Sequence, residues 1–458
     1  MGKGFDIRST DNLSVRAMNL RTPEIMGRVQ AQVEEHYRSS LVERIRSNQG
    51  TLKVGRTTIH LAKKFGFCYG VERAIDLTYA ARRVFQGERI FILGEIIHNP
   101  EVNRQMRTLG IQSLLVNSVH PDLNTLRKED VVIVPAFGIP VMLLRRIRQI
   151  GCRIVDTTCG DVMSVWKRVQ KNASESITSV IHGKAYHEET QATASYALGK
   201  GASHFLIVLN LEETEVICRY IRKGGRKSSF LRSFQGAFSP GFDPDLHLRR
   251  VGVANQTTML KMETEAVQRR IRNAIMDRDG GSEGNFRSFD TICGATQERQ
   301  DALFSLLHSK QLHLLLVIGG YNSSNTAHLA EIGNTSELPT YFIHNSQCLE
   351  SASLIRHFHV ALRREIRTME WLPNTPLQIG ITAGASCPNN LIEEVIRRLL
   401  DLRGEALQQT EPDPGSDAPK KEQSRHQNHP RPLPSFRKWK ESSDGPRFGK
   451  AGTSTNAF

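Results

Sequence analysis

From residue 57 onward, short apolar runs alternate along the chain with amphipathic segments. Continuous apolar runs are typical of strands buried on both faces of a parallel sheet, and the amphipathic segments between them are typical of covering helices. The pattern therefore predicts an α/β fold with mainly parallel sheets. The expected strands are residues 57–61, 89–93, 131–134, 153–155, 179–181, 205–209, 314–318, 340–343 and 377–381.

Two of the expected helices follow a cysteine and repeat the same apolar spacing. In each, apolar positions recur at i, i+3, i+4 and i+7, which is the spacing of one helix face. After Cys68 these positions are Val71, Ala74, Ile75 and Thr78, and after Cys159 they are Val162, Val165, Trp166 and Val169. A third cysteine, Cys293, stands in residues 290–296, which repeat the chemistry of residues 156–161 around Cys159.

Each of these three cysteines is expected where a strand ends and a helix begins. At such a position the free backbone N–H groups and the helix dipole favour a thiolate over a thiol. Three converging thiolates would bind a soft metal centre and leave one coordination position for a substrate. A single cysteine is more often a small buried hydrophobe. The repeat favours the metal site here.

The repeat extends beyond the cysteines. His98 follows Cys68 by 30 positions, His187 follows Cys159 by 28, and Ser323 follows Cys293 by 30. Three similar α/β units with loops at the carboxyl ends of their strands predict a pseudo-threefold arrangement with the site at its centre. The expected units are residues 52–157, 158–291 with an insertion at 223–250, and 292–404.

The two ends of the chain have a different composition from these units. Residues 1–51 carry one helical pattern, Pro23 to Ile45, which we interpret as an N-terminal helical extension packed on the core. Residues 405–458 are rich in Gln, Pro, Ser, Lys and Asp with almost no aliphatic side chains. They are expected to form a disordered basic and polar tail.

Composition and charge narrow the functional classes. No run of about 18 apolar residues and no secretory signal occurs, so we expect no membrane span and a cytoplasmic protein. Seven widely separated cysteines indicate metal binding or catalysis rather than a disulfide framework. The net charge of +14 suits an anionic partner, which is a phosphorylated small substrate, an acidic protein or a nucleic acid. Spacings typical of nucleic-acid-binding motifs are missing, which weakens the last alternative.

Two polar loops carry further candidate chemistry. Residues 182–190 hold two histidines, a lysine and two glutamates after a strand, a set that can bind an anion and deliver a proton. Residues 319–326 form a glycine-led loop rich in hydroxyls and amides, which is typical of a phosphate cradle. Helix capping explains each loop equally well when taken alone. Their similar offsets from the cysteines favour function.

Eight motifs occur in order between about residue 40 and residue 400. They are Gly66-Phe67-Cys68, Glu95-Ile96-Ile97-His98-Asn99-Pro100, Asp156-Thr157-Thr158-Cys159, His182-Gly183-Lys184 with His187-Glu188-Glu189-Thr190, Ala254-Asn255-Gln256-Thr257-Thr258-Met259-Leu260, Thr291-Ile292-Cys293 with Ala295-Thr296-Gln297-Glu298-Arg299-Gln300, Asn322-Ser323-Ser324-Asn325 and Gly384-Ala385-Ser386. This set resembles the 4-hydroxy-3-methylbut-2-enyl diphosphate reductase family. Pro135-Ala136-Phe137-Gly138 resembles its longer branch, which is typical of photosynthetic organisms.

The resemblance implies a pseudo-threefold trefoil of three α/β units around a central iron–sulfur site. The implied reaction removes the hydroxyl of 4-hydroxy-3-methylbut-2-enyl diphosphate with two electrons and two protons. It gives isopentenyl and dimethylallyl diphosphates, the last step of the methylerythritol phosphate route to isoprenoids. The implied cofactor is one [4Fe–4S] cluster held by Cys68, Cys159 and Cys293, whose unique iron takes the substrate hydroxyl.

Further site residues follow from the same resemblance. Glu189 matches the family's proton donor, and Thr257 matches the threonine that bonds the substrate hydroxyl. The expected diphosphate ligands are His98, His187, Ser323, Ser324, Asn325 and Ser386, with Thr258 nearby. An electron donor is required, and a ferredoxin or flavodoxin with its reductase is expected. A plastid location is expected instead of the cytoplasm if the source is a photosynthetic eukaryote.

Three positions depart from the family pattern. Phe137 stands where the shorter branch has a histidine, so a neighbour must supply the missing diphosphate donor. Gly160 replaces a usual proline beside Cys159. Cys387, next to Ser386, is either a fourth thiol near the site or a packing residue. The remaining cysteines have no counterpart in the repeat and are expected to be core or surface thiols: Cys152, Cys218 and Cys348.

Two other classes of protein remain as alternatives. One is a non-catalytic iron–sulfur electron carrier, although carriers saturate their iron with protein ligands and need no phosphate loops. The other is a basic nucleic-acid-binding protein with a Cys₃ zinc site. Iron, sulfide and colour in the anaerobically purified protein would separate both iron-containing classes from the zinc protein.

Overall fold

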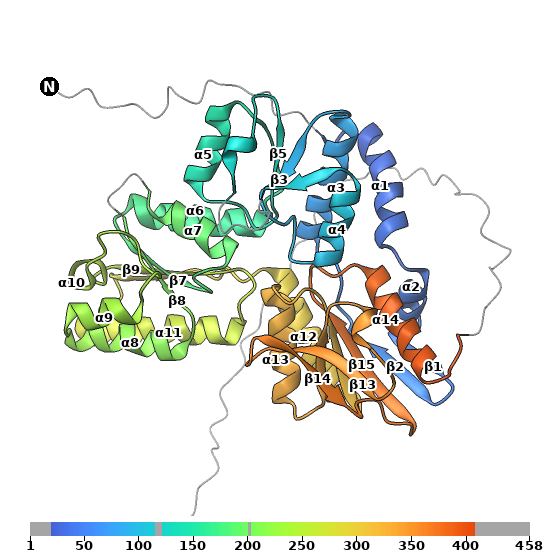
Figure 1. Cartoon of the computed structure of the whole chain (residues 1–458). Coiled ribbons are helices and arrows are strands. Elements are labelled where there is room, and N and C mark those ends of the chain that lie inside the picture. Colours follow the sequence, from blue (N-terminus) through green and yellow to red (C-terminus); the bar gives the residue numbers. More distant parts are fainter. Residues whose placement is uncertain (1–19, 115–120, 200–202, 408–458) are drawn as a thin grey trace, which may run out of the picture. The chain divides into compact units, whose positions relative to one another are not determined.

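The computed structural model of the chain describes residues 20–114, 121–199 and 203–407, and within them the strands form three sheets (Figure 1). The first sheet has the order β4 (Ile111–Ser113), β3 (Ile90–Ile92), β5 (Val131–Val134) and β6 (Arg153–Asp156). The second has the order β10 (Phe286–Ser288), β9 (Val251–Asn255), β7 (Thr178–His182) and β8 (Phe205–Val208). Every pair in these two sheets is parallel, which confirms the predicted α/β class.

The third sheet is larger and mixed. Its order is β1 (Thr51–Val54), β2 (Thr57–Leu61), β15 (Leu377–Ala383), β11 (Leu314–Ile318), β12 (Thr340–Ile343), β13 (Leu354–His359) and β14 (Arg364–Met369). The pairs from β2 to β12 are parallel, whereas β1, β13 and β14 are added antiparallel at the edges. These three edge strands were not predicted from the sequence, because they mix polar and apolar residues and contain no continuous apolar run.

The three sheets repeat one order of strands around their cysteines. In each sheet the strand that precedes a cysteine (β6, β10 or β2) pairs in parallel with the strand that precedes a polar loop (β5, β9 or β15). The strand Thr57–Leu61 lies in the range 52–157 expected for the first unit, yet its parallel partner is β15. Since β6 and β10 likewise precede the helices of Cys159 and Cys293 and pair with β5 and β9, this pairing follows the repeat.

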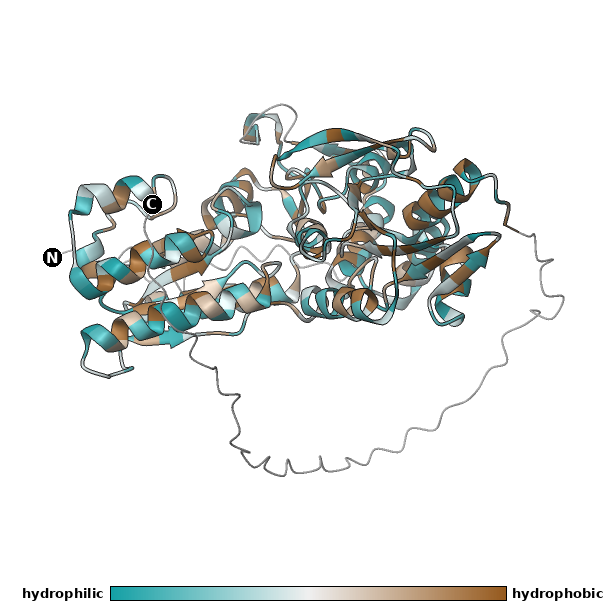
Figure 2. Ribbon diagram, turned by 90° about the horizontal axis from the view of Figure 1, so that it is seen from below, coloured by the Kyte–Doolittle hydropathy of each residue, from teal (hydrophilic) through white to brown (hydrophobic). Residues whose placement is uncertain are grey.

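Helices connect the strands and cover the sheets (Figure 1). They are α3 (Tyr69–Val84), α4 (Pro100–Thr108), α5 (Val141–Ile150), α6 (Gly160–Ser174), α7 (Glu188–Ala197), α8 (Leu211–Lys223), α11 (Lys261–Arg278), α12 (Gly294–Ser309), α13 (Ser324–Thr335) and α14 (Asn389–Leu402), with the short turns η2 (Leu123–Thr125) and η3 (Ser346–Cys348). Figure 2 shows helices striped in apolar and polar colours, as expected for helices with one face on a sheet. The residues expected on the inner faces of α3 and α6 are buried.

The N-terminal helical pattern is split in two. Instead of one helix from Pro23 to Ile45, the chain forms α1 (Pro23–Tyr37) and α2 (Ser40–Ser47). Ser39 takes extended backbone angles and caps α2 by accepting a hydrogen bond from the Val42 N–H at 3.0 Å. The break sends the two halves to different cores, because α1 packs near α3 whereas α2 joins the core of the third sheet.

The expected insertion is described in full and the expected tail only in part. Residues 223–250 hold two short helices, α9 (Lys227–Ser233) and α10 (Pro244–His247). Residues 405–407, which composition places in the tail, pack on the fold: Glu405 Oε1 accepts a hydrogen bond from the Arg56 N–H at 3.1 Å. Leu407 lies against the third-sheet core. The rest of the expected tail, 408–458, lies outside the described residues, as do residues 1–19 of the expected N-terminal extension.

The apolar runs form the cores. Every residue of β5 and β11 is buried, which explains why these strands are apolar without alternation. The central strands are thus fixed by burial on both faces, and their carboxyl ends carry the polar loops. Among the described residues, no helix has the length and apolar character needed to cross a membrane.

Candidate active site

One cavity of about 840 Å³ collects the site residues expected from the sequence. It is lined by loops and helix starts from all three sheets. The expected residues on its wall are Cys68, Cys159, Cys293, Glu189, Thr257, His98, His187, Thr258, Ser323, Ser324, Asn325 and Ser386. The structure therefore brings every one of them together, although they are spread over more than 300 positions of sequence.

The three cysteines occupy equivalent positions. Cys68, Cys159 and Cys293 are the N-cap residues of α3, α6 and α12, as the sequence predicted. The backbone N–H of each cysteine donates to a backbone carbonyl in the polar loop that follows the neighbouring strand of the same sheet. The acceptors are Ala385 for Cys68 (3.2 Å), Ala136 for Cys159 (2.8 Å) and Thr257 for Cys293 (3.2 Å).

Gly70 gives the thiols room to approach one another. A Cβ atom at Gly70 would lie 2.6 Å from Sγ of Cys159 and 3.9 Å from Sγ of Cys68. Any larger residue would therefore displace the Cys159 side chain. All seven cysteines lie in the described residues and none is in a disulfide. Two thiols from different helices thus converge on the first turn of α3.

The thiols differ from the expectation in their acidity. Burial raises the pKa of Cys159, and it raises the pKa of Cys293 to about 12. Hydrogen bonds from helix N-terminal N–H groups, such as the 3.3 Å bond from Thr296 to Cys293 Sγ, act in the predicted direction but are outweighed. The expected preference for thiolates is therefore wrong for Cys159 and Cys293 in the protein alone. Three buried thiolates need a cation among them, which a metal centre supplies.

Arg299 is a cavity residue to which we assigned no role from the sequence. Its side chain is buried and donates to the carbonyls of Ala295 and Gly66. Burial lowers the pKa of its guanidinium, and the neighbouring Cys68 and Cys293 oppose that shift. A buried cation beside two thiols partly balances their charge. Arg299 stands in residues 295–300, which are part of a motif that the sequence shows. From the sequence alone, however, one arginine in an amphipathic helix cannot be distinguished from a surface residue.

Glu189 is a buried carboxyl next to Thr257. It is 3 % exposed, and its Oε1 accepts a hydrogen bond from the Thr257 N–H at 2.6 Å. Burial raises the pKa of Glu189 to about 7, and the bonds from Thr257 limit the rise. Desolvation is therefore the main cause of the raised pKa. A carboxyl with this pKa holds a proton near neutral pH and can deliver it.

His187 has a defined tautomer. The N–H of Glu189 donates to its Nδ1 at 3.2 Å, and burial lowers the pKa of His187 well below its ordinary value. The ring is therefore neutral and carries its proton on Nε2. The 4.0 Å contact between its Nδ1 and the Glu188 carboxylate is not a salt bridge, since a neutral ring has no charge to pair.

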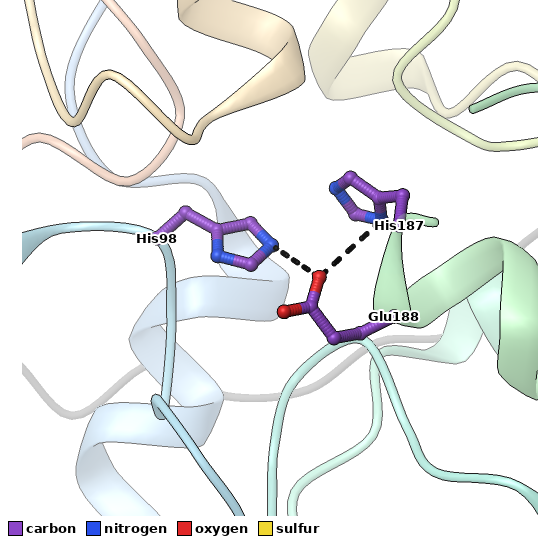
Figure 3. A group of neighbouring side chains, drawn as sticks. All are labelled: His98, His187 and Glu188. Carbon is purple, nitrogen blue, oxygen red and sulfur yellow. Dashed lines mark ion pairs between the residues drawn. The ribbon is translucent and has the colours of Figure 1, made fainter. Parts of the chain in front are cut away.

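His98 and Glu188 face each other across the same part of the cavity. Figure 3 shows the Glu188 carboxylate between the imidazoles of His98 and His187. Its Oε2 lies 3.6 Å from Nε2 of His98, which is too long for a hydrogen bond. Among the described residues, this buried Nε2 has no hydrogen-bond partner. The Nδ1 atom lies 3.2 Å from Oε2 of Glu95, to which it donates in one tautomer, and 3.3 Å from Nδ2 of Asn322, from which it accepts in the other, so the ring has a fixed direction.

Phe137 occupies the place beside the two histidines. Its ring lies flat on His98, with centroids 4.6 Å apart and planes at 8°, and meets His187 edge-on at 6.4 Å. Phe137 thus offers no hydrogen-bond donor at this place. Its phenyl ring stacks on His98 instead and fixes the orientation of the imidazole. The neighbour expected to replace the missing donor is not identified by these contacts.

Gln256 connects the polar loops and was missed as a site residue. It is fully buried, and its Oε1 accepts from the Lys184 N–H and from Thr190 Oγ1, both at 3.2 Å. Its Nε2 donates to the hydroxyls of Thr258 at 2.9 Å and Ser324 at 3.1 Å. One amide thus orients two cavity hydroxyls from different loops. Its position between Asn255 and Thr257 was noted, but only the fold reveals its partners.

The third-sheet loops are tied to the His98 loop. Asn99 donates from Nδ2 to the Ser386 carbonyl at 2.9 Å, and Ser386 Oγ donates to the His98 carbonyl at 3.0 Å. Asn325 uses its Oδ1 to accept from the Ala385 N–H at 2.9 Å. Its buried Nδ2 has no partner within the described part of the chain. Asn325 and His98 thus present two unsatisfied nitrogens at one cavity, where an anion would complete them.

The remaining expectations concern single residues. Cys387 is fully buried in the core of the third sheet and is not on the cavity wall, so the packing alternative is the one that holds. Cys152 and Cys218 are core thiols as expected. Gly160 is the first residue of α6, and a Cβ there would meet nothing within 4 Å. The open space would also admit the proline that is usual in the family, so no steric reason explains the glycine at this position.

The fold and site define a class: an α/β enzyme whose cavity combines three cysteine-led helix starts with a wall of anion-binding groups and a buried acid. Comparison with known proteins identifies the family. The family model described as LytB protein matches residues 59–400, so the chain belongs to the LytB family.

Curated relatives and solved structures agree with this assignment. The 4-hydroxy-3-methylbut-2-enyl diphosphate reductase of Thermosynechococcus vestitus is 46% identical over 380 residues, which cover 82% of this chain and 93% of the relative. The protein of the same name from Cyanothece sp. is 46% identical over 370 residues, covering 80% and 90%. A structure of the E-1-hydroxy-2-methyl-but-2-enyl-4-diphosphate reductase from Plasmodium falciparum shares the fold, with TM-score 0.55, 20% identity and 75% and 87% coverage.

Proposed function

We propose that the chain is a 4-hydroxy-3-methylbut-2-enyl diphosphate reductase. It removes the allylic hydroxyl of this substrate, consuming two electrons and two protons and giving isopentenyl or dimethylallyl diphosphate and water. The observation that carries the proposal is the single cavity that joins three thiols, a buried acid and unpaired nitrogens. An electron carrier has no use for the acid or for an anion site of this kind.

The donor set fits one [4Fe–4S] cluster held by Cys68, Cys159 and Cys293. The fit is supported by the three helix starts on one cavity, by the space beside Gly70 and by thiols that stay protonated without a cation. When bound, the cluster supplies electrons and an open iron position that binds the substrate hydroxyl. Arg299 would balance part of the negative charge that the thiolates bring.

The diphosphate would bind at the opposite wall. His187 and Ser323 are the N-caps of α7 and α13, and α4 begins directly after His98 and Asn99, so three helix starts meet this wall. Helix N-termini favour anions through their free N–H groups and dipoles. His98 Nε2, His187 Nε2 and Asn325 Nδ2 would bond phosphate oxygens. Ser324, Thr258 and Ser386 add hydroxyls to the same wall.

Glu189 and Thr257 would serve the reacting end of the substrate. Glu189 carries a proton near neutral pH because of its burial, and that proton would leave with the hydroxyl as water. The backbone bond from Thr257 holds the Glu189 carboxyl in place, while the Thr257 hydroxyl would bond the substrate hydroxyl. Since the Thr257 carbonyl also accepts from the Cys293 N–H, the acid and the cluster ligand share one support.

The partner that supplies electrons is inferred from charge. A chain with a net charge of +14 favours an acidic partner through electrostatic steering, and we propose a ferredoxin or flavodoxin with its reductase. A cytoplasmic or plastid location stays a prediction, which the cyanobacterial origin of the relatives supports.

The test is turnover by the anaerobically purified full chain. We expect a brown protein with iron and sulfide that converts the substrate to the two diphosphates when a chemical reductant is added. Iron and colour without turnover would support the electron carrier instead. A colourless protein that contains zinc and no iron would contradict both readings.

A further inference from the structure

A second cluster of metal-binding side chains lies in the third sheet, away from the cavity. His344 follows β12, Cys348 ends η3, and Glu365 lies on β14. The Cys348 Sγ atom is 3.4 Å from Nδ1 of His344, which in turn is 4.0 Å from Oε1 of Glu365. One ligand atom from each residue lies within 4.8 Å of the others. None of the three side chains lines the active-site cavity.

We propose that His344, Cys348 and Glu365 form a zinc site. A thiolate, an imidazole nitrogen and a carboxylate are the three ligand types that zinc uses, and tetrahedral bonding places such atoms about 3.3 to 3.6 Å apart. The thiol and imidazole already have this separation, and a small rotation of the Glu365 carboxylate completes the set. Tyr321 Oη lies 3.5 Å from Cys348 Sγ.

The charges of the cluster suit a divalent cation. A zinc ion, the Cys348 thiolate and the Glu365 carboxylate sum to zero. Arg356 contacts both Glu365, at 2.8 Å, and Glu350, at 3.2 Å, and Glu350 is shared with Arg367 at 3.3 Å.

Packing holds the donor atoms in place before any metal binds. The Tyr321 ring stacks on Phe358 at 4.9 Å and meets His344 edge-on at 4.9 Å. Asn345 caps η3 by accepting from the Gln347 N–H at 3.0 Å, which fixes the turn between His344 and Cys348. A site supported in this way loses little conformational freedom on binding.

A metal ion can reach the cluster from solvent. Cys348 is fully buried, but the side chains of His344 and Glu365 are 25 % and 37 % exposed. Zinc would therefore enter on the Glu365 side and bind against the buried sulfur. Tyr321 links the cluster to the loop of Ser323, a cavity residue, so zinc would also stiffen that loop.

Metal analysis of the full chain, purified anaerobically with its cluster, tests the site. The protein is incubated with zinc sulfate and passed through a desalting column, and zinc and iron per chain are measured by mass spectrometry. We expect about one zinc in the parent. Glu365→Gln keeps the shape of a partly exposed side chain and should weaken zinc binding at least about tenfold. Cys348→Ala should abolish it, whereas Cys218→Ala, which removes a buried thiol elsewhere, should retain it.

Cobalt(II) gives a second readout. In a difference spectrum against the cobalt-free protein, the parent and Cys218→Ala should show a thiolate-to-cobalt charge-transfer band, and Cys348→Ala should not. Iron content reports whether each variant has kept its fold, and if Cys348→Ala loses iron, Glu365→Gln decides. Zinc that is absent from the parent, or equal in parent, Cys348→Ala and Glu365→Gln, would overturn the site. This test does not depend on the proposed reductase activity.

Discussion

The backbone N–H of Thr257 donates to Oε1 of Glu189 at 2.6 Å, which joins the two residues that we assign to the reacting end of the substrate. This bond leaves Oε2 of Glu189 as the oxygen that carries the acid proton. Because Thr257 also receives the N–H of Cys293 on its carbonyl, the position of the acid is set relative to a cluster ligand. The proposed removal of the substrate hydroxyl needs the acid and the cluster at the same end of the substrate, so it depends on this geometry.

Replacing Glu189 by Gln should remove proton delivery while it preserves shape and hydrogen bonding. We expect the variant to assemble its cluster and to bind substrate within a few-fold of the parent. Turnover should fall by about 100-fold or more, which is the usual scale for a positioned general acid. Steady-state kinetics and iron content measure the two effects separately.

The neighbouring Glu188→Gln is the matched control. Glu188 is half exposed and approaches His98 only at 3.6 Å, so its loss should affect turnover much less. Near-full turnover in Glu189→Gln together with abolished turnover in Glu188→Gln would show that the acid is Glu188.

The pH dependence of kcat should report the raised pKa of Glu189. An acid works only while protonated, and an ordinary glutamate with pKa 4.5 would be ionised at pH 6. Burial raises this pKa to about 7, so kcat should be high below pH 7 and fall above it, by up to about tenfold per pH unit. Rates measured from pH 6 to 9 that stay constant would contradict the assignment.

Serine replacements should separate the cluster ligands from the other thiols. Cys68→Ser, Cys159→Ser and Cys293→Ser each remove a ligand from the shared cavity and should lose most of their iron and turnover. Cys152→Ser, Cys218→Ser and Cys348→Ser alter thiols off the cavity wall and should keep their iron. Iron and sulfide assays on anaerobic preparations measure this. Normal iron in Cys293→Ser would refute the cluster assignment.

Removing the ring of Phe137 should weaken substrate binding rather than chemistry. Its stacking on His98 is worth about 0.5 to 1.5 kcal/mol, so Phe137→Ala should raise KM about 2- to 10-fold and leave kcat within a few-fold. Phe304→Ala, at an exposed position of α12, serves as control. A large fall in kcat at unchanged KM would place Phe137 in the chemical step.

Much of this protein could be deduced from residue order alone. Apolar runs such as 314–318 identify buried parallel strands, because only burial on both faces selects continuous apolar side chains. The spacing after Cys68 and Cys159 identifies helix starts, and the repeat places three thiols at equivalent points. The N-terminal helix break was missed, since Ser39 caps α2 only when the chain turns toward another core.

Tertiary structure decided what depends on atoms brought together from distant segments. It placed β2 beside β15, gave Gln256 partners in the loops 182–190 and 319–326, and stacked Phe137 on His98. It also reversed the expected acidity of Cys159 and Cys293, because the helix-start effect is local whereas desolvation depends on everything packed around a group. Local periodicity can be read along the chain, but burial and electrostatics are sums over neighbours that only the fold assembles.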